Sequence, residues 1–374
     1  MKKLIYFTVL VSLLTGFLSV SVSAVDLSNP DELQSKITQE LSEAIDSDTA
    51  EALEKIGLKD FSFDEIYSIS FDNITAFFAD TLKEKAEHII KDFAQLFCVI
   101  MFIGILSALV NQTSDYKMTE ILSVVILTVL AVNAINGSLG AVVSVLSLSG
   151  KFMLGFAPVY TLIISLSGNT ATALTYNTFA MLFAQLISSL ISTHIVDLIG
   201  VFFCLGISFA MNGSVSISRF SSCVNRLVTT SLGFIASVFT GFLSLKNILS
   251  VSVDRVSVRS IRFLISSLIP VVGSSISDAY SSLLGSINLI KSSVALVGIL
   301  VIVIINTPII VETLIYYISF NLLGYLSEGL SLGRAGEVFR VFSCGVRILL
   351  LLCIFEMFIM IITTGIVLSV KNGG

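Results

Sequence analysis

Long apolar runs, interrupted only briefly by polar residues, recur along most of this 374-residue chain. A membrane-spanning helix needs about 17 to 25 mostly apolar residues. Runs of this kind occupy residues 93–110, 121–146, 170–191, 195–211, 227–245, 294–318 and 341–369. Two further apolar pieces, 152–168 and 263–290, contain Pro158 and Pro270 in their middle. The pattern predicts an all-α fold, a polytopic membrane helix bundle with about seven spans plus two proline-broken segments.

The composition and the distribution of charge divide the chain into two regions. Hydrophobic residues make up 55% of the chain and charged residues 13%, whereas a soluble domain carries about 25% charged residues. Residues 25–92 hold 17 acidic and 6 basic side chains, and residues 93–374 hold 9 acidic and 13 basic ones. We therefore expect an acidic domain at 25–92 on one side of the membrane and a polytopic membrane domain at 93–374.

The first 24 residues have the features of a signal peptide. Lys2 and Lys3 precede an apolar stretch at 4–18, and small residues at 22–24 provide a cleavage site. An uncleaved first span is the alternative interpretation. Under both interpretations the region that follows is exported.

The exported region is predicted to be a small helical domain. An apolar stripe at every fourth position predicts its first helix, through Leu33, Ile37, Leu41 and Ile45. A second short helix is expected at 49–56, ending at Gly57, and an amphipathic helix at 77–92 leads into the first span. The core of so small a domain is marginal, so we expect it to lean on a partner or on the membrane domain. A solvated acidic spacer is the alternative.

The positions of the basic residues favour one topology. If 152–168 crosses the bilayer, the basic cluster between residues 246 and 262 lies outside the cell, against the positive-inside rule. If 152–168 is re-entrant, the cluster is cytoplasmic, and a label at Ser257 would report the cytoplasm. The re-entrant topology is therefore preferred.

The same topology indicates an inverted repeat. The pair Phe97-Cys98 precedes Pro158 much as Phe203-Cys204 precedes Pro270. Each half then holds two spans, one proline-broken piece and a third span, an arrangement that many transporters use to build a site at mid-membrane. Chance similarity between apolar segments is the alternative.

Helix breaks and charges inside apolar sequence mark the candidate functional residues. Non-helical backbone in hydrocarbon needs cover from protein or water, which predicts an interior position for the candidate helix breaks Pro158, Pro270, Gly273 and Pro308. Charges at membrane depth are costly, and the candidates are Asp278, Lys291, Glu312, Arg347 and Glu356. Asp278 and Lys291 flank one proline-broken segment, so an ion pair between them is one candidate arrangement. Each of these residues lines a pathway or only braces the bundle, and the sequence leaves both interpretations open.

The motifs of soluble enzymes are missing from the sequence. There is no P-loop, no dinucleotide-binding glycine motif opening a helix after a strand, and no nucleophile elbow. His88 and His194 are far apart, and the five cysteines have no ligand spacing. We therefore expect no catalytic residue, no cofactor, no metal site, no nucleic-acid partner and no enzymatic activity.

The sequence I-P-V-V-G-S-S-I-S-D-A-Y at 269–280, followed by G-S-I-N-L-I-K at 285–291, resembles the stage III sporulation protein AE family of endospore-forming bacteria. The segment F-A-P-V at 156–159 and the order of signal peptide, acidic domain and spans agree with the same family.

The resemblance implies a function. It implies a permease-like or export-gate-like component of the mother cell-to-forespore channel, in the mother-cell membrane around the forespore. It also implies partners, namely other membrane and ring-forming channel proteins and a cytosolic ATPase. A scaffold that anchors other channel proteins, or an independent small-molecule transporter, is the alternative.

Overall fold

The computed structural model describes residues 45–58, 69–110, 116–190, 196–212, 217–268 and 273–368, together with Gln39 and Glu65. Within these residues the chain is helical and holds no strand, which confirms the all-α prediction. The elements are α3 (Ser47–Lys55), α5 (Phe71–Val110), α6 (Tyr116–Leu166), α7 (Thr170–Leu190), α8 (Val196–Asn212), α9 (Ile217–Leu268), α10 (Gly273–Gly329) and α11 (Gly333–Leu368).

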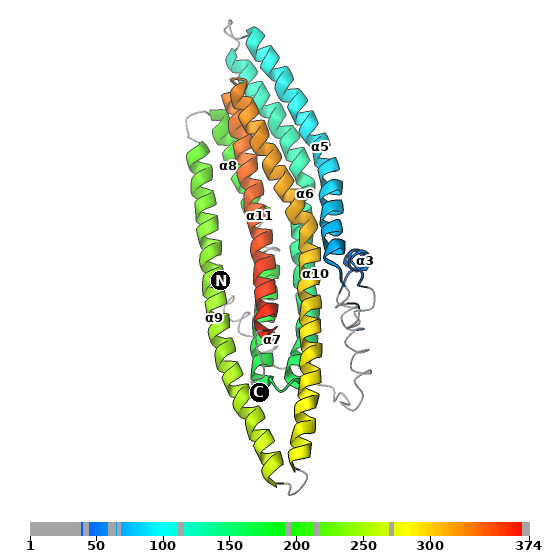
Figure 1. Ribbon diagram of the computed structural model, residues 1–374. Helices are drawn as coiled ribbons and strands as arrows, with labels where there is room; N and C mark the ends of the chain where they lie inside the picture. Colours follow the sequence, from blue (N-terminus) through cyan, green and yellow to red (C-terminus); the bar gives the residue numbers. More distant parts are fainter. Residues whose placement is uncertain are drawn as a thin grey trace.

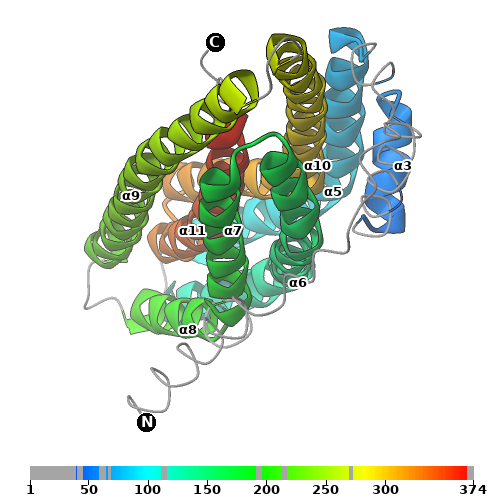
Figure 2. The same cartoon turned by 90° about the horizontal axis from the view of Figure 1, so that it is seen from below.

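The long helices run side by side in one elongated bundle (Figure 1). α10 and α11 lie at its centre, with α6 and α7 packed against them, and the end-on view in Figure 2 places α9 and α5 on opposite sides. α10 has 57 residues, which corresponds to about 85 Å at a rise of 1.5 Å per residue. The hydrocarbon core of a bilayer is about 30 Å thick, so the longest helices extend well beyond it.

Five of the described helices are long and apolar enough to cross a membrane: α5, α6, α9, α10 and α11. This finding confirms a membrane helix bundle but not the predicted division into about seven spans. The run at 195–211 forms α8, which has only 17 residues. The runs predicted as separate pieces merge into continuous helices, because the short polar interruptions between them do not end a helix.

The prediction that 152–168 forms a separate re-entrant piece is wrong. α6 continues from residue 116 to residue 166 with Pro158 inside it, and α10 likewise contains Pro308. A proline removes one backbone hydrogen bond and crowds the preceding turn, but neighbouring helices in a bundle can compensate for this loss.

The second predicted re-entrant piece is also divided differently. Its first residues end α9 and its later residues begin α10, while Pro270 lies outside the described residues. Pro158 lies eight residues before the end of α6, whereas Pro270 follows the end of α9. Since Pro270 lies outside the described residues, the matching of the two prolines is not tested and the inverted repeat stays a prediction.

Two turns reverse the chain with residues in the left-handed conformation. Gly168 has φ +82°, and the Asn169 amide donates to the Ile164 carbonyl at 3.2 Å. This is the pattern with which a glycine closes a helix C-terminus. Ser331 takes the same place between α10 and α11 with φ 62°, although a residue with a Cβ atom is strained there.

The short helix predicted at 49–56 is confirmed as α3, and Gly57 follows it with φ +96°. Leu53 and Leu58 are buried, and the Asn73 amide group donates to the Ile56 carbonyl at 3.3 Å. α3 contacts α5 and α10. The described part of the acidic region therefore packs on the bundle rather than projecting as a solvated spacer.

The predicted amphipathic helix at 77–92 is part of α5, which continues without a break to residue 110. The first helix predicted in the exported region and the signal peptide fall outside the described residues, apart from Gln39 and Ile45.

Small residues let the helices approach closely at the centre of the bundle. A Cβ atom on Gly298 of α10 would collide with the Phe156 ring of α6, and one on Gly206 of α8 would collide with Val341 of α11. Without lipid-driven hydrophobic attraction between helices, such close contact is a main source of association in membranes.

Candidate functional site inside the helix bundle

Three of the predicted site residues are exposed and do not lie in the bundle interior: Pro158, Asp278 and Arg347. Pro158 is two residues from the buried Phe156, which places it about 200° around the helix. Asp278 is the sixth residue of α10, and the first turns of this helix extend past the turn between α6 and α7 (Figure 1). Arg347 lies on α11 in a strip of exposed residues spaced seven apart, with Arg340 and Ile354. These three predictions of interior position are wrong, because hydropathy does not show which face of a helix has a neighbour.

The predicted pair between Asp278 and Lys291 is also corrected. Both residues lie on the continuous helix α10, 13 residues apart, which corresponds to about 20 Å along its axis. An ion pair needs its atoms within about 4 Å. Lys291 itself is 2% exposed. Gly273 is the first residue of α10, and Pro308 is half-buried within it.

Glu312 is at the centre of a polar cluster that joins three helices. Its Oε2 atom lies 3.1 Å from Nζ of Lys85 on α5, and its Oε1 atom accepts a hydrogen bond of 2.5 Å from the Ser138 hydroxyl on α6. One turn further along α10, the Tyr316 hydroxyl donates to Oδ2 of Asp92 at 2.8 Å. The predicted intramembrane charge has thus found partners on other helices, which is what its burial in an apolar setting requires.

A second polar cluster lies deeper in the bundle. Asn306 on α10 and Ser149 on α6 are fully buried, and the Asn306 amide donates to Ser149 Oγ at 3.1 Å. Glu356 on α11 is 2% exposed and lies beside both side chains. Because Asn306 precedes Glu312 by six residues, the two clusters are only about 9 Å apart along α10.

Asp254, a buried carboxylate on α9, was not among the site residues predicted from the sequence. It is 1% exposed and accepts hydrogen bonds from the amides of Ala171 at 2.8 Å and Thr172 at 2.9 Å. The Thr172 hydroxyl adds a third at 2.7 Å. A carboxylate at a helix N-terminus satisfies free amides and the positive end of the helix dipole. Asp254 stands next to Arg255 in the basic cluster between residues 246 and 262, so no pattern pointed to it.

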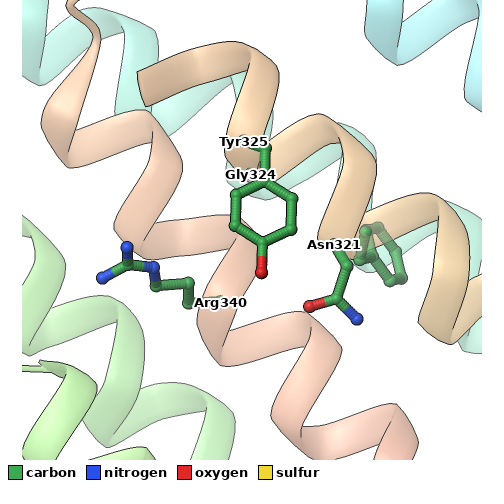
Figure 3. A pocket seen from close by; sticks show the side chains of 5 residues that line it. Asn321, Gly324, Tyr325 and Arg340 are labelled. Carbon is green, nitrogen blue, oxygen red and sulfur yellow. The ribbon is translucent and has the colours of Figure 1, made fainter. Parts of the chain in front are cut away.

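The surface also carries an open pocket of about 230 Å³ between α10 and α11. Figure 3 shows Tyr325 between Arg340 and Asn321 at this place. Arg340 forms an ion pair with Glu328, and Tyr325 is 68% exposed. The pocket is shallow and its charged group is already paired, so the interior clusters remain the better candidate site. No group of three metal-binding side chains gathers within the part of the chain that the structure describes.

Long apolar helices around a partly charged interior define a polytopic α-helical membrane protein. The profile of the family "Stage III sporulation protein AE" matches residues 56–370, and the chain belongs to this family. The family has a role in sporulation, which confirms the resemblance and assigns this chain to that process.

A curated relative supports the same assignment. The protein named stage III sporulation protein AE from Bacillus subtilis (strain 168) is 20% identical over 153 residues, which is 41% of this chain and 38% of the relative. The aligned part of the chain therefore spans less than half the length of this relative. No solved structure matches the chain.

Proposed function

We propose that this chain is the permease-like or export-gate-like component of the channel between the mother cell and the forespore. Its place would be the mother-cell membrane around the forespore, with residues 25–92 on the extracytoplasmic side. The observation that supports the proposal best is the Glu312 cluster, in which charged groups from α5 and α10 meet inside the bundle.

Charges at such a position are costly. Two charges that leave water for the partly buried interior of a bundle carry a desolvation cost that their mutual attraction offsets only in part. Packing alone does not require charged side chains here, since apolar side chains of similar volume pack at least as well without the desolvation cost. Polar groups that face the interior of a membrane bundle are typical of pathways for ions or solutes. Glu312 and Lys85 are the residues of this cluster that would contact a passing solute, because their side chains are still 14% and 30% exposed.

The proposed partners are other membrane and ring-forming proteins of the channel and a cytosolic ATPase. α9 offers a surface for such contacts, since only 6% of its most apolar window is buried within the chain. Phe234 and Leu249 on this helix are 68% and 64% exposed.

The decisive experiment replaces the natural chain by full-length variants in the sporulating organism. Glu312→Gln and Lys85→Met remove one charge each, and Glu87→Gln removes an exposed carboxylate from α5 as the control. Heat-resistant spores and a late forespore reporter are counted at matched protein levels. We expect both to fall at least tenfold for the first two variants and to stay unchanged for the control. Normal sporulation by Glu312→Gln and Lys85→Met at normal protein levels would contradict the proposal.

A scaffold that anchors other channel proteins is the second candidate function, and the exposed face of α9 favours it. Phe234→Ala and Leu249→Ala keep this face apolar but reduce its contact area. Under the scaffold proposal these variants lose co-purifying channel proteins, while Glu312→Gln keeps them and sporulates normally. Under the permease proposal Glu312→Gln keeps the partners and loses sporulation.

A further inference from the structure

The deeper cluster contains buried oxygen atoms without hydrogen-bond donors. The Glu356 carboxyl lies beside Ser149 and Asn306, yet no hydrogen bond of good geometry reaches either of its oxygens from the described residues. Oδ1 of Asn306 likewise accepts no hydrogen bond of good geometry from the described residues. Three acceptor oxygens of this cluster are therefore buried without a hydrogen-bond partner of good geometry among the described residues.

Of the two donors in the cluster, the Asn306 amide is already committed, and only the neutral Ser149 hydroxyl can still donate to Glu356. The Asn306 amide nitrogen donates to Ser149 Oγ at 3.1 Å and to the Ile302 carbonyl at 3.0 Å. A buried polar atom without a partner costs about 1 to 3 kcal/mol, and a bare buried carboxylate costs more. The arrangement lacks a positive charge between the carboxylate and the amide oxygen.

The surrounding helices do not provide this charge from their described residues. The described charged or titratable groups that these helices carry in the neighbouring stretches include Lys151 on α6, Tyr176 on α7, Lys246 on α9 and, on α10, Lys291 and Glu312. α11 itself adds Arg347 and Cys353.

Each of these groups is exposed, distant or uncharged. Lys151, Lys246 and Arg347 are exposed. Lys291 lies 15 residues before Asn306 on α10, about 22 Å along the axis. Glu312 is held by Lys85 and Ser138, and the tyrosine and cysteine carry no positive charge.

We propose that Glu356, Asn306 and Ser149 form a binding site for one monovalent cation, a proton or Na⁺, at the junction of α6, α10 and α11. The valence follows from the single carboxylate, because divalent cations need several carboxylates or ordered waters. The ligands are all oxygen atoms, which suit a proton or a hard cation. The site does not depend on the proposed role in a channel.

Occupation of this site would be coupled to the packing of the bundle. α10 packs on α11 and α6, and the Asn306–Ser149 hydrogen bond joins α10 to α6 within the cluster. A carboxylate that has lost its cation must therefore either stay unsolvated or admit water between the helices. The occupied site therefore stabilises the closed arrangement that the structure shows, and release of the cation favours a looser one.

The experiment measures thermal unfolding of the purified full-length protein in lipid nanodiscs. NaCl is exchanged for choline chloride at constant ionic strength, and the pH is varied separately. Wild type is compared with Glu356→Gln and Ser149→Ala. The matched controls are Asp197→Asn, an exposed carboxylate on α8, and Ser123→Ala, a buried serine on α6 that donates to the Glu120 carbonyl.

A Na⁺ site predicts that the Tm of wild type rises by several degrees with NaCl but not with choline chloride, because a ligand that binds only the folded state stabilises it. A proton site predicts no effect of NaCl and a Tm that rises as the pH falls. In each case the dependence disappears in Glu356→Gln, weakens in Ser149→Ala and persists in the controls. Equal Tm responses of wild type and Glu356→Gln to both NaCl and pH would overturn the proposal.

Measurements on the wild type alone test the proposal even if one of the variants does not fold. Titration calorimetry with NaCl detects a Na⁺ site directly. Infrared spectroscopy in H₂O and D₂O detects the carbonyl band of a protonated buried carboxyl group. Heat of Na⁺ binding or such a band supports the corresponding cation, and the absence of both overturns the proposal.

Discussion

Lys85 on α5 and Glu312 on α10 form an ion pair with 3.1 Å between Nζ and Oε2. The pair joins α5 to α10, a central helix of the bundle. Their side chains are 30% and 14% exposed, so water screens the attraction only in part. The pair is therefore suited to fix the position in which α5 packs against α10.

Breaking this pair is expected to lower stability in a non-additive way. Glu312→Gln and Lys85→Met should each reduce the free energy of unfolding by about 1 to 2 kcal/mol, less than for a fully buried pair. The double variant should lose less than the sum of the two, since the second change removes the charge that the first left unpaired. Denaturant unfolding in mixed micelles measures the cycle. Additive losses would show that the two charges do not interact.

Removing the Asp254 carboxylate is expected to free the N-terminus of α7. Asp254→Ala eliminates three hydrogen bonds to Ala171 and Thr172, which should cost about 2 to 3 kcal/mol. Asp254→Asn keeps an acceptor and should cost less. Hydrogen exchange measures the effect directly, as the amides of Ala171 and Thr172 should exchange faster. Ser252→Ala, at an exposed position of α9, is the control, and slow exchange in Asp254→Ala would contradict the capping role.

Adding one methyl group at Gly298 is expected to separate α10 from α6. The new Cβ atom would collide with the ring of Phe156, which is fully buried and stacked between Phe152 and Tyr160. Overpacking of this kind costs about 1 to 3 kcal/mol, more than the helix propensity that Gly298→Ala gains.

The same substitution at an open position provides the control for Gly298. Gly137 on α6 has no atom within 4 Å of its Cβ position, so Gly137→Ala should stabilise the helix by up to about 1 kcal/mol. The difference in Tm between the two variants tests the contact. A Gly298→Ala variant as stable as Gly137→Ala would show that α6 and α10 do not approach as described.

Relaxing the turn between α10 and α11 is expected to stabilise the protein slightly. Ser331 has φ 62°, where a residue with a Cβ atom pays about 1 to 2 kcal/mol. Ser331→Gly removes this strain but also increases the freedom of the unfolded chain, so a net gain of about 0.5 kcal/mol is expected. Ser331→Ala keeps the strain and should show no gain in thermal unfolding. A loss of stability in Ser331→Gly would mean that the serine contributes more than its backbone conformation.

The sequence by itself determined the class of the fold and the positions of the charged residues that lie within apolar segments. Apolar runs of spanning length can only become helices in a bilayer, and the short helix that ends at Gly57 followed from its local pattern. Glu312 and Glu356 stood out because charges are rare in apolar sequence. These features depend on each residue and its neighbours in the chain.

Tertiary structure decided which of the predicted residues lie inside the bundle. Pro158, Asp278 and Arg347 are exposed, whereas Asp254 is buried on the N-terminus of α7. Hydropathy depends only on the type of side chain, but burial depends on whether another helix covers the helix face that carries the residue. The partners of Glu312 and Glu356 come from helices far away in the sequence, so only the packing of these helices could bring them together.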